Sequence, residues 1–170
     1  MNLLKIGLDK KKFSIFEKKN IYSIILILLI FLIDRYSKMK ILDNLNQETI
    51  YVNSFINFDL IWNTGIGFGL FDHNTALIYN SLTLIIGFVL LALIYIAIFS
   101  EKIDTFIFSI IIGGALGNFY DRLRLNAVPD FIDIHYMNFH WFTFNVADIF
   151  ITLGIITFLL KDFFIKKNEK

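Results

Sequence analysis

The sequence predicts an all-α membrane protein with four transmembrane helices and a small extracytoplasmic β-sheet between the first two. The 170 residues are 56% hydrophobic, with a mean hydropathy of +0.65, whereas soluble domains are about 45–50% apolar. The excess lies in long runs of Ile, Leu and Phe, the pattern of membrane-spanning helices. A stretch rich in β-branched and aromatic residues follows the first run, which is typical of strands.

The first span is predicted over residues 21–42. Residues 1–20 are polar and lysine-rich, which indicates a cytoplasmic tail and an uncleaved first span, not a removable signal peptide. The apolar core over 21–33 is shorter than the roughly twenty residues that cross a bilayer. The helix must therefore continue through Asp34 and Lys38, which lie one turn apart on one face.

Residues 43–75 are predicted to form the surface β region. Two strand-like segments, 49–52 and 55–62, flank an Asn-Ser turn. Glycines at alternate positions then allow a tight turn or a close backbone approach, and they follow Asn63 as Gly65, Gly67 and Gly69.

The other spans are predicted over 76–99, 105–122 and 144–165. A tight turn over 100–104 joins the second to the third, and a surface loop over 123–143 joins the third to the fourth. We expect residues 1–170 to form a single membrane domain.

The basic residues predict that both termini are cytoplasmic, because Lys and Arg gather on the inner side of a membrane. This orientation leaves eleven of the 16 Lys and Arg inside, and the long loop over 41–75 carries none. All four polar clusters would then lie near the outer face. They are Asp34 with Lys38, Asn118 with Asp121 and Arg122, Asn63 to Gly69, and Asn145 with Asp148.

Asp130 and Asp148 are the candidate catalytic residues. Asp148 lies in an apolar segment, where a charge is costly and indicates function. Two close carboxyl groups share a proton, so one can accept a proton from water while the other donates one. Alternatively, Asp148 is only a helix N-terminal acid that interacts favourably with the helix dipole, and Asp130 is a solvated loop acid. Asp133 is another candidate for the catalytic role assigned to Asp130.

Other polar residues suggest binding and support. Asn118 and Arg122, one turn apart, could bind a substrate carbonyl or a lipid phosphate, or Arg122 only snorkels to the interface. Asp121 could pair with Arg122. Asp34 and Lys38 suggest an ion pair that ties the first span to its neighbours. Close helix packing explains Gly113 and Gly117, and Asn63 and Asn145 suit groups that hold carboxylates or loops in place.

Composition disfavours several other classes of site. There is no cysteine, which excludes a disulfide or a thiol nucleophile. The net charge of +1 gives no indication of a nucleic-acid partner. His73, His135 and His140 have neither one-turn helical spacing nor an obvious third ligand, so we expect no metal and no cofactor.

Five short motifs resemble those of lipoprotein signal peptidase, also called signal peptidase II, in that family's order. They are Asp34-x-x-x-Lys38, Asn63-x-Gly65-x-x-Phe68, Gly113-Gly114-x-x-Gly117-Asn118-x-x-Asp121-Arg122, Val128-x-Asp130-Phe131 and Phe144-Asn145-x-Ala147-Asp148. The resemblance covers about residues 34–151. Pro129 and the pair Ile66-Gly67 depart from the usual pattern without removing a chemical group.

The resemblance implies an intramembrane aspartyl protease of the bacterial inner membrane, with its active site near the outer face. It would cut prolipoproteins before a diacylglyceryl-modified cysteine, as a monomer among membrane lipids and without a cofactor. Asp130 and Asp148 would be catalytic, and Asn118, Arg122 and Asn145 would bind substrate. Supporting positions would be Asp34, Lys38, Asn63, Gly65 and Asp121.

Two other functions stay open from the residues alone. A transporter or proton-conducting protein would use the acids as relay sites, although the sequence has no inverted repeat or broken span. A non-catalytic assembly or lipid-binding protein would tolerate Asn in place of either aspartate.

Overall fold

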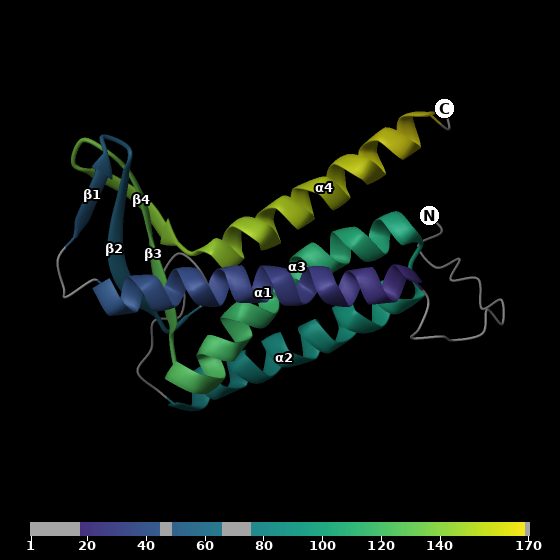
Figure 1. The fold of residues 1–170 in the computed structure, drawn as a ribbon, viewed down its shortest axis with the longest axis horizontal. Helices are drawn as coiled ribbons and strands as arrows, with labels where there is room; N and C mark the ends of the chain where they lie inside the picture. The colour runs from purple at the N-terminus through teal and green to yellow at the C-terminus, as the bar shows by residue number, and fades with distance from the viewer. Residues whose placement is uncertain (1–17, 45–48, 66–75, 169–170) are drawn as a thin grey trace.

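The structure is a computed structural model that describes residues 18–44, 49–65 and 76–168. The helices run lengthwise, with the sheet at one end and the N-terminus of α1 and the C-terminus of α4 at the other (Figure 1). In chain order the elements are α1 (Lys18–Asn44), β1 (Ile50–Asn53), β2 (Ile56–Asn63), α2 (Ala76–Phe99), α3 (Lys102–Leu125), β3 (Val128–Tyr136), β4 (Phe139–Phe144) and α4 (Val146–Asn168).

Three helices in the described residues are long and apolar enough to cross a membrane, namely Lys18–Asp43, Tyr79–Phe99 and Lys102–Leu125. They correspond to three of the four predicted spans. The helix α4 is not among them, and its sequence is interrupted by Asp148, Lys161 and Asp162. The predicted count of four spans is therefore supported only as far as three.

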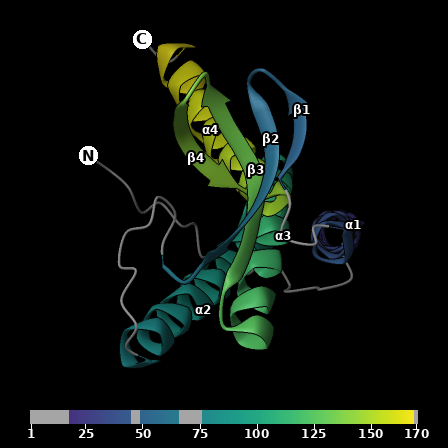
Figure 2. The same ribbon diagram turned by 90° about the vertical axis from the view of Figure 1, so that its left-hand side faces the viewer.

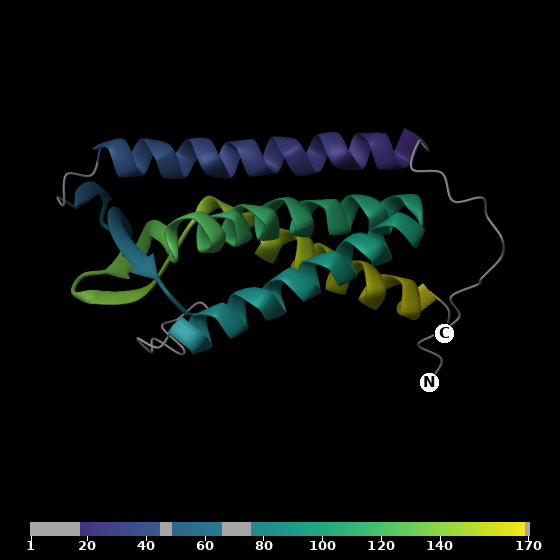
Figure 3. The ribbon, with the colours of Figure 1, turned by 90° about the horizontal axis from the view of Figure 1, so that it is seen from below.

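Helix α3 packs against α1, α2 and α4, and Figure 3 shows it among them. Its glycines allow this close approach. A Cβ atom on Gly113 would lie 2.8 Å from Cβ of Ile30 in α1, and one on Gly114 would lie 2.5 Å from the carbonyl oxygen of Ala147 in α4. The helix-packing interpretation of Gly113 is confirmed, and Gly117 likewise faces α1, at the Asp34 side chain.

The helix ends differ slightly from the predicted spans, although α2 coincides with 76–99. Helix α3 begins at Lys102, within the predicted turn, because the backbone N–H of Thr105 already donates to the carbonyl of Glu101 at 2.8 Å. Asp104 in this first turn also favours the helix dipole. Helix α4 begins at Val146, two residues late, because Phe144 ends β4.

The sheet is larger than the sequence predicted. The expected hairpin is present as β1 and β2, and Asn53 Oδ1 closes its turn by accepting from the N–H groups of Phe55 and Ile56. Residues 123–143, however, are not a loop, because they contain β3 and most of β4. The four strands form one antiparallel sheet in the order β1-β2-β3-β4 (Figure 2).

Strand β3 fixes the sheet to the helices. Phe131 is 3% exposed and packs with Ile41 near the end of α1. Pro129 pairs with Trp62 of β2, while the pairing with β4 begins only at Ile132. Pro129 therefore lies where β3 has a single neighbouring strand, the situation in which a strand tolerates a residue without an N–H.

Candidate active site

Asp148 lies in the first turn of α4 and forms a reciprocal cap with Asn145. The backbone N–H of Asp148 donates to Asn145 Oδ1 at 3.1 Å, and Asp148 Oδ2 accepts from the backbone N–H of Asn145 at 3.1 Å. This is the arrangement of a capping box. The structural interpretation of Asp148 as a helix N-terminal acid is therefore correct, but it leaves Oδ1 for a second partner.

Asp130 comes from β3 and is 4% exposed. Its Oδ2 accepts from Asn63 Nδ2 at 2.8 Å, and its Oδ1 accepts from Asn145 Nδ2 at 2.6 Å. The fully buried Asn145 thus contacts both candidate acids. Asp130 is not a solvated loop acid, because the sheet buries it and two amides hold both of its oxygens.

Burial raises the pKa of Asp130 to about 6, from an ordinary value near 4. The hydrogen bond from Asn63 opposes this rise in pKa, because it stabilises the ionised form. The nearby charge of Asp148 adds to the rise in pKa, while the hydrogen bond from Asn145 again reduces it. Asp130 therefore keeps its proton to a higher pH than an isolated carboxylic acid would, because its pKa is raised.

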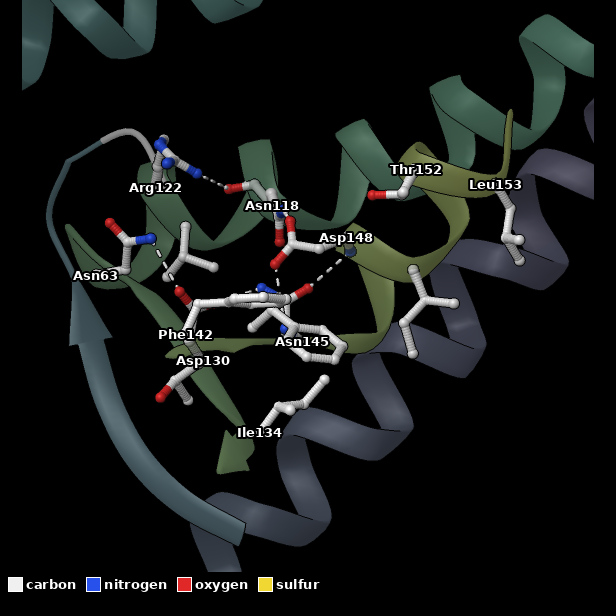
Figure 4. Close-up of a pocket in the computed structure, with 14 residues that line it drawn as sticks. Asn63, Asn118, Arg122, Asp130, Ile134, Phe142, Asn145, Asp148, Thr152 and Leu153 are labelled. Carbon is white, nitrogen blue, oxygen red and sulfur yellow. Dashed lines mark hydrogen bonds between the residues drawn. The ribbon is translucent and has the colours of Figure 1, made fainter. Parts of the chain in front are cut away.

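A cavity of about 460 Å³ opens onto both carboxyl groups. Figure 4 shows the side chains of Asn63, Asn118 and Asn145 around Asp130 and Asp148. Arg122 lies on the same side as Asn118, and apolar residues complete the wall, among them Ile134, Phe142 and Leu153. The cavity thus places a polar carboxyl pair beside an apolar wall.

A buried ion network lies behind the pair. Lys38 has no exposed surface, and its Nζ donates to Asp34 Oδ2 at 3.0 Å, Asp121 Oδ2 at 2.7 Å and Asn118 Oδ1 at 2.8 Å. The predicted Asp34–Lys38 pair is therefore present, and it ties α1 to α3. Asp121 pairs with Lys38 and Arg35, so an Asp121–Arg122 pair is not its structural role.

Two residues carry this network to the carboxyl pair. Asn118 Nδ2 donates to Asp148 Oδ1 at 2.7 Å, so Asn118 connects Lys38 to the acid. Asp34 Oδ1 accepts from the backbone N–H of Ala147 at 3.1 Å, so it also holds the first turn of α4.

Arg122 and Asn63 hold the chain that follows β2. Arg122 donates to the carbonyl of Gly65 at 2.8 Å, and Asn63 Oδ1 accepts from the N–H of Gly65 at 2.9 Å. Arg122 is only 6% exposed, so it is not merely snorkelling. The other residues predicted for this turn, Gly67, Phe68 and Gly69, lie outside the described residues, as does His73.

Sequence reasoning missed Arg35, which it counted only as an outer positive charge. Arg35 contacts Asp34 at 3.1 Å and Asp121 at 2.5 Å, so two cations face two carboxylates between α1 and α3.

Asp133 is separate from the carboxyl pair. Its side chain contacts His135 and His140, and no contact with Asp148 is found among the described residues. The sequence argument against a histidine site considered helical spacing and found no third ligand. The strands overturn that premise, because β3 and β4 pair His135 directly with His140 and bring Asp133 beside them.

The comparisons with known proteins identify the family. The family model described as signal peptidase (SPase) II matches residues 26–164. The chain belongs to the signal peptidase II family. The match includes all the candidate site residues, from Asp34 to Asp148.

Similar curated proteins carry the name lipoprotein signal peptidase. The one from Pelagibacter ubique (strain HTCC1062) is 48% identical over 159 residues, covering 89% of this chain and 96% of that protein. The one from Francisella tularensis subsp. novicida (strain U112) is 38% identical over 150 residues, covering 85% of this chain and 93% of that protein.

Solved structures show the same fold. A bacterial membrane enzyme solved by the in meso method at 2.3 Å resolution has a TM-score of 0.72 and 27% identity, covering 88% of this chain and 92% of that one. A second, at 1.9 Å resolution, has a TM-score of 0.68 and 25% identity, covering 82% and 91%. With its three apolar helices, this signal peptidase II family member is a membrane protein.

The ion network predicts a large cost for removing its central cation. We expect Lys38→Met to destabilise the protein by about 3–5 kcal/mol, because it leaves buried carboxylates without their partner. Unfolding in mixed detergent micelles measures this. Lys40→Met, an exposed lysine on the same helix, serves as the control. Equal stability of the two variants would contradict the importance of the buried network.

Proposed function

We propose that this chain is a membrane aspartyl endopeptidase that removes signal peptides from diacylglyceryl-modified bacterial prolipoproteins, cutting before the lipidated cysteine. The observation that carries the proposal is the pairing of Asp130 and Asp148 through Asn145 at one cavity. Membership in the signal peptidase II family supports the substrate class, and the names of the curated relatives agree.

In the proposed mechanism, the carboxyl pair holds one proton and water is the nucleophile. The ionised carboxylate accepts a proton from water as its oxygen attacks the scissile carbonyl carbon. The protonated carboxyl donates its proton to the carbonyl oxygen, which gives a tetrahedral diol. As the diol collapses, this carboxylate takes a proton back from one hydroxyl, and the carboxyl that accepted the water proton donates it to the leaving amine. The peptide C–N bond breaks, one water is consumed, and neither a covalent intermediate nor a cofactor is required.

The substrate-binding roles follow from groups at the cavity. Asn118 and Arg122 carry polar side chains at its wall, suited to peptide carbonyl oxygens. Asn145 holds both acids and would also contact the substrate backbone. The proposed supporting residues hold the acids and the turn after β2 in position and form the buried ion network. They are Asp34, Lys38, Asn63, Gly65 and Asp121.

We also propose that α4 is a fourth span and that both termini are cytoplasmic. Its 23 residues extend about 34 Å, enough to cross the hydrocarbon core. Exposed apolar side chains such as Leu153, Leu159 and Phe163 suit contact with lipid. Lys161 is paired with Asp104 of α3, which lowers the cost of its charge. The sheet and the carboxyl pair would then lie near the outer face of the inner membrane.

In this arrangement the partners are a prolipoprotein already anchored by its lipid and the surrounding membrane lipids. The protein would act as a monomer and would not bind nucleic acid. Acids at the outer end of the helices would meet a cleavage site at headgroup depth. This placement is what an enzyme needs when its substrate never leaves the bilayer.

The topology can be tested with single cysteines, because the native chain has none. In intact spheroplasts, an impermeant maleimide should label Asn138→Cys in the β3–β4 turn. It should label Glu101→Cys, between α2 and α3, and Asn168→Cys, at the end of α4, only after permeabilisation. Labelling of both Asn138→Cys and Asn168→Cys from outside would show that α4 does not cross.

The carboxyl pair can be tested by cleavage of a purified diacylglyceryl-modified precursor. We expect Asp130→Asn and Asp148→Asn each to lower kcat by about 10⁴-fold or more, because each removes proton transfer by the pair. The matched control is Asp59→Asn, an acid on β2 whose described side-chain contact is a 3.4 Å hydrogen bond with Thr49. Retained cleavage in both dyad variants would overturn the catalytic assignment, and an inactive but folded wild type would overturn the function.

The raised pKa of Asp130 predicts the pH dependence. Burial raises the pKa of Asp130 to about 6, so kcat/KM should fall on the alkaline side as Asp130 loses its proton. Asn63→Ala removes a hydrogen bond that favours the ionised form. The alkaline limb should therefore move to higher pH, by about one pH unit.

The control for this pH profile is Asn138→Ala, an asparagine in the exposed β3–β4 turn. It should leave the limb in place. A limb that moves to lower pH in Asn63→Ala would contradict the proposed role of the Asn63 hydrogen bond, whatever the change in maximal rate.

A further inference from the structure

We propose that Asp133, His135 and His140 form a binding site for a divalent transition metal ion, with zinc as the best fit. We call these three residues the hairpin triad. They come from β3 and β4, and one potential ligand atom from each lies within 4.8 Å of the others. Nothing in the proposed peptide-bond chemistry uses them.

The strand register explains how the triad assembles. Asp133 and His135 are two positions apart on β3, so their side chains lie on the same face of the sheet. His140 on β4 is the partner of His135, directly after a register shift between Ile134 and His135, and paired residues also share a face. The two imidazole rings stack with centroids 5.3 Å apart. Backbone pairing therefore holds all three ligands together before any ion binds.

The distances suit a four-coordinate ion. Zinc binds imidazole nitrogen and carboxylate oxygen at about 2.0–2.2 Å, so tetrahedral ligand atoms lie about 3.3–3.5 Å apart. His135 Nδ1 is 3.4 Å from Asp133 Oδ2. His140 Nδ1 is closer, at 2.7 Å from the same oxygen, and must move away by about 0.6–0.8 Å to reach this spacing. The His140 side chain is 59% exposed, so its ring is able to turn.

Buried polar atoms without partners favour an ion over a purely structural Asp–His hydrogen bond. His135 is 6% exposed, yet its Nδ1, which faces Asp133, has no hydrogen-bond partner. Asn57 pairs with Asp133 from β2 on the other side, and its buried Oδ1 also lacks a partner. Leaving such atoms unsatisfied is costly. One bound cation would satisfy His135 Nδ1 directly and would offer Asn57 Oδ1 a fourth position.

The ligand set indicates the type of ion. Two imidazoles and a carboxylate favour zinc and similar first-row metals over magnesium or calcium, which prefer oxygen ligands only. Asp133 and Asp130 differ by three positions on β3, so in a regular strand their side chains point to opposite faces, although His140 and Asp130 both line a second cavity. The triad is therefore a ligand set distinct from the carboxyl pair, and its ion would join β3 to β4 at the hairpin.

The test uses the purified full-length protein in lipid nanodiscs, stripped with chelator and dialysed. Zn²⁺ is titrated by calorimetry, Co²⁺ is followed by its visible absorption, and the Zn²⁺-dependent rise in Tm is recorded. We expect one Zn²⁺ per chain with a Kd of about 10 µM or tighter, and an intense tetrahedral Co²⁺ band that Zn²⁺ abolishes.

Variants locate the ion. His140→Gln changes an exposed side chain and should still fold, so it is the decisive variant. His135→Gln and Asp133→Asn complete the set. Each should weaken Zn²⁺ binding by at least about tenfold and remove the Tm shift. Asp59→Asn is the matched surface control, and Asp130→Asn should bind Zn²⁺ like the wild type.

Three outcomes would overturn the proposal. They are no Zn²⁺ binding by the wild type below about 100 µM, His140→Gln binding as tightly as Asp59→Asn, and loss of the ion in Asp130→Asn but not in the triad variants. The last would place the ion at the carboxyl pair. Because the readouts are binding, absorption and Tm, they do not depend on whether the protein cleaves prolipoproteins.

Discussion

The arrangement of the helices depends on the burial of one ammonium group. Lys38 is fully enclosed and must find compensation within the protein, since an unpaired charge there would cost several kcal/mol. Its three partners lie on α1 and α3. Only one axial placement of α1 against α3 brings all three to Nζ. The same ion group then extends to α4, because Asp34 also accepts from the backbone N–H of Ala147.

Neutral amides separate this charged network from the carboxyl pair. Asn118 accepts from Lys38 with its oxygen and donates to Asp148 with its nitrogen. Asn63 and Asn145 hold Asp130, and among the described residues no ion pair reaches either acid. A direct Lys or Arg contact would stabilise the ionised carboxylates and depress their pKa. Amides fix the geometry with less of this effect, so burial still raises the pKa of Asp130.

The sequence predicted features that depend on local patterns. Hydropathy located the apolar helices, the Asn53 turn located the first hairpin, and the polar motifs contained the residues that the structure joins by hydrogen bonds. Sequence missed β3 and β4, because β3 pairs with β2 across 65 to 78 positions of the chain and β4 joins the sheet only through β3. The turn over Met137 and Asn138, between aromatic and β-branched segments, was the available signal. The hairpin triad was missed for the same reason, since cross-strand register has no helical spacing.

The two acids belong to different layers, which makes their pairing a consequence of docking the sheet onto the helices. Asp130 lies on β3, while Asp148 begins α4. Asn145 lies at the junction of β4 and α4 and forms hydrogen bonds with both acids, so it couples the position of the sheet to that of the helix. The cavity has sheet residues such as Phe142 on one wall and α4 residues such as Leu153 on the other. A displacement of the sheet relative to α4 would therefore strain the contacts that Asn145 makes with both acids.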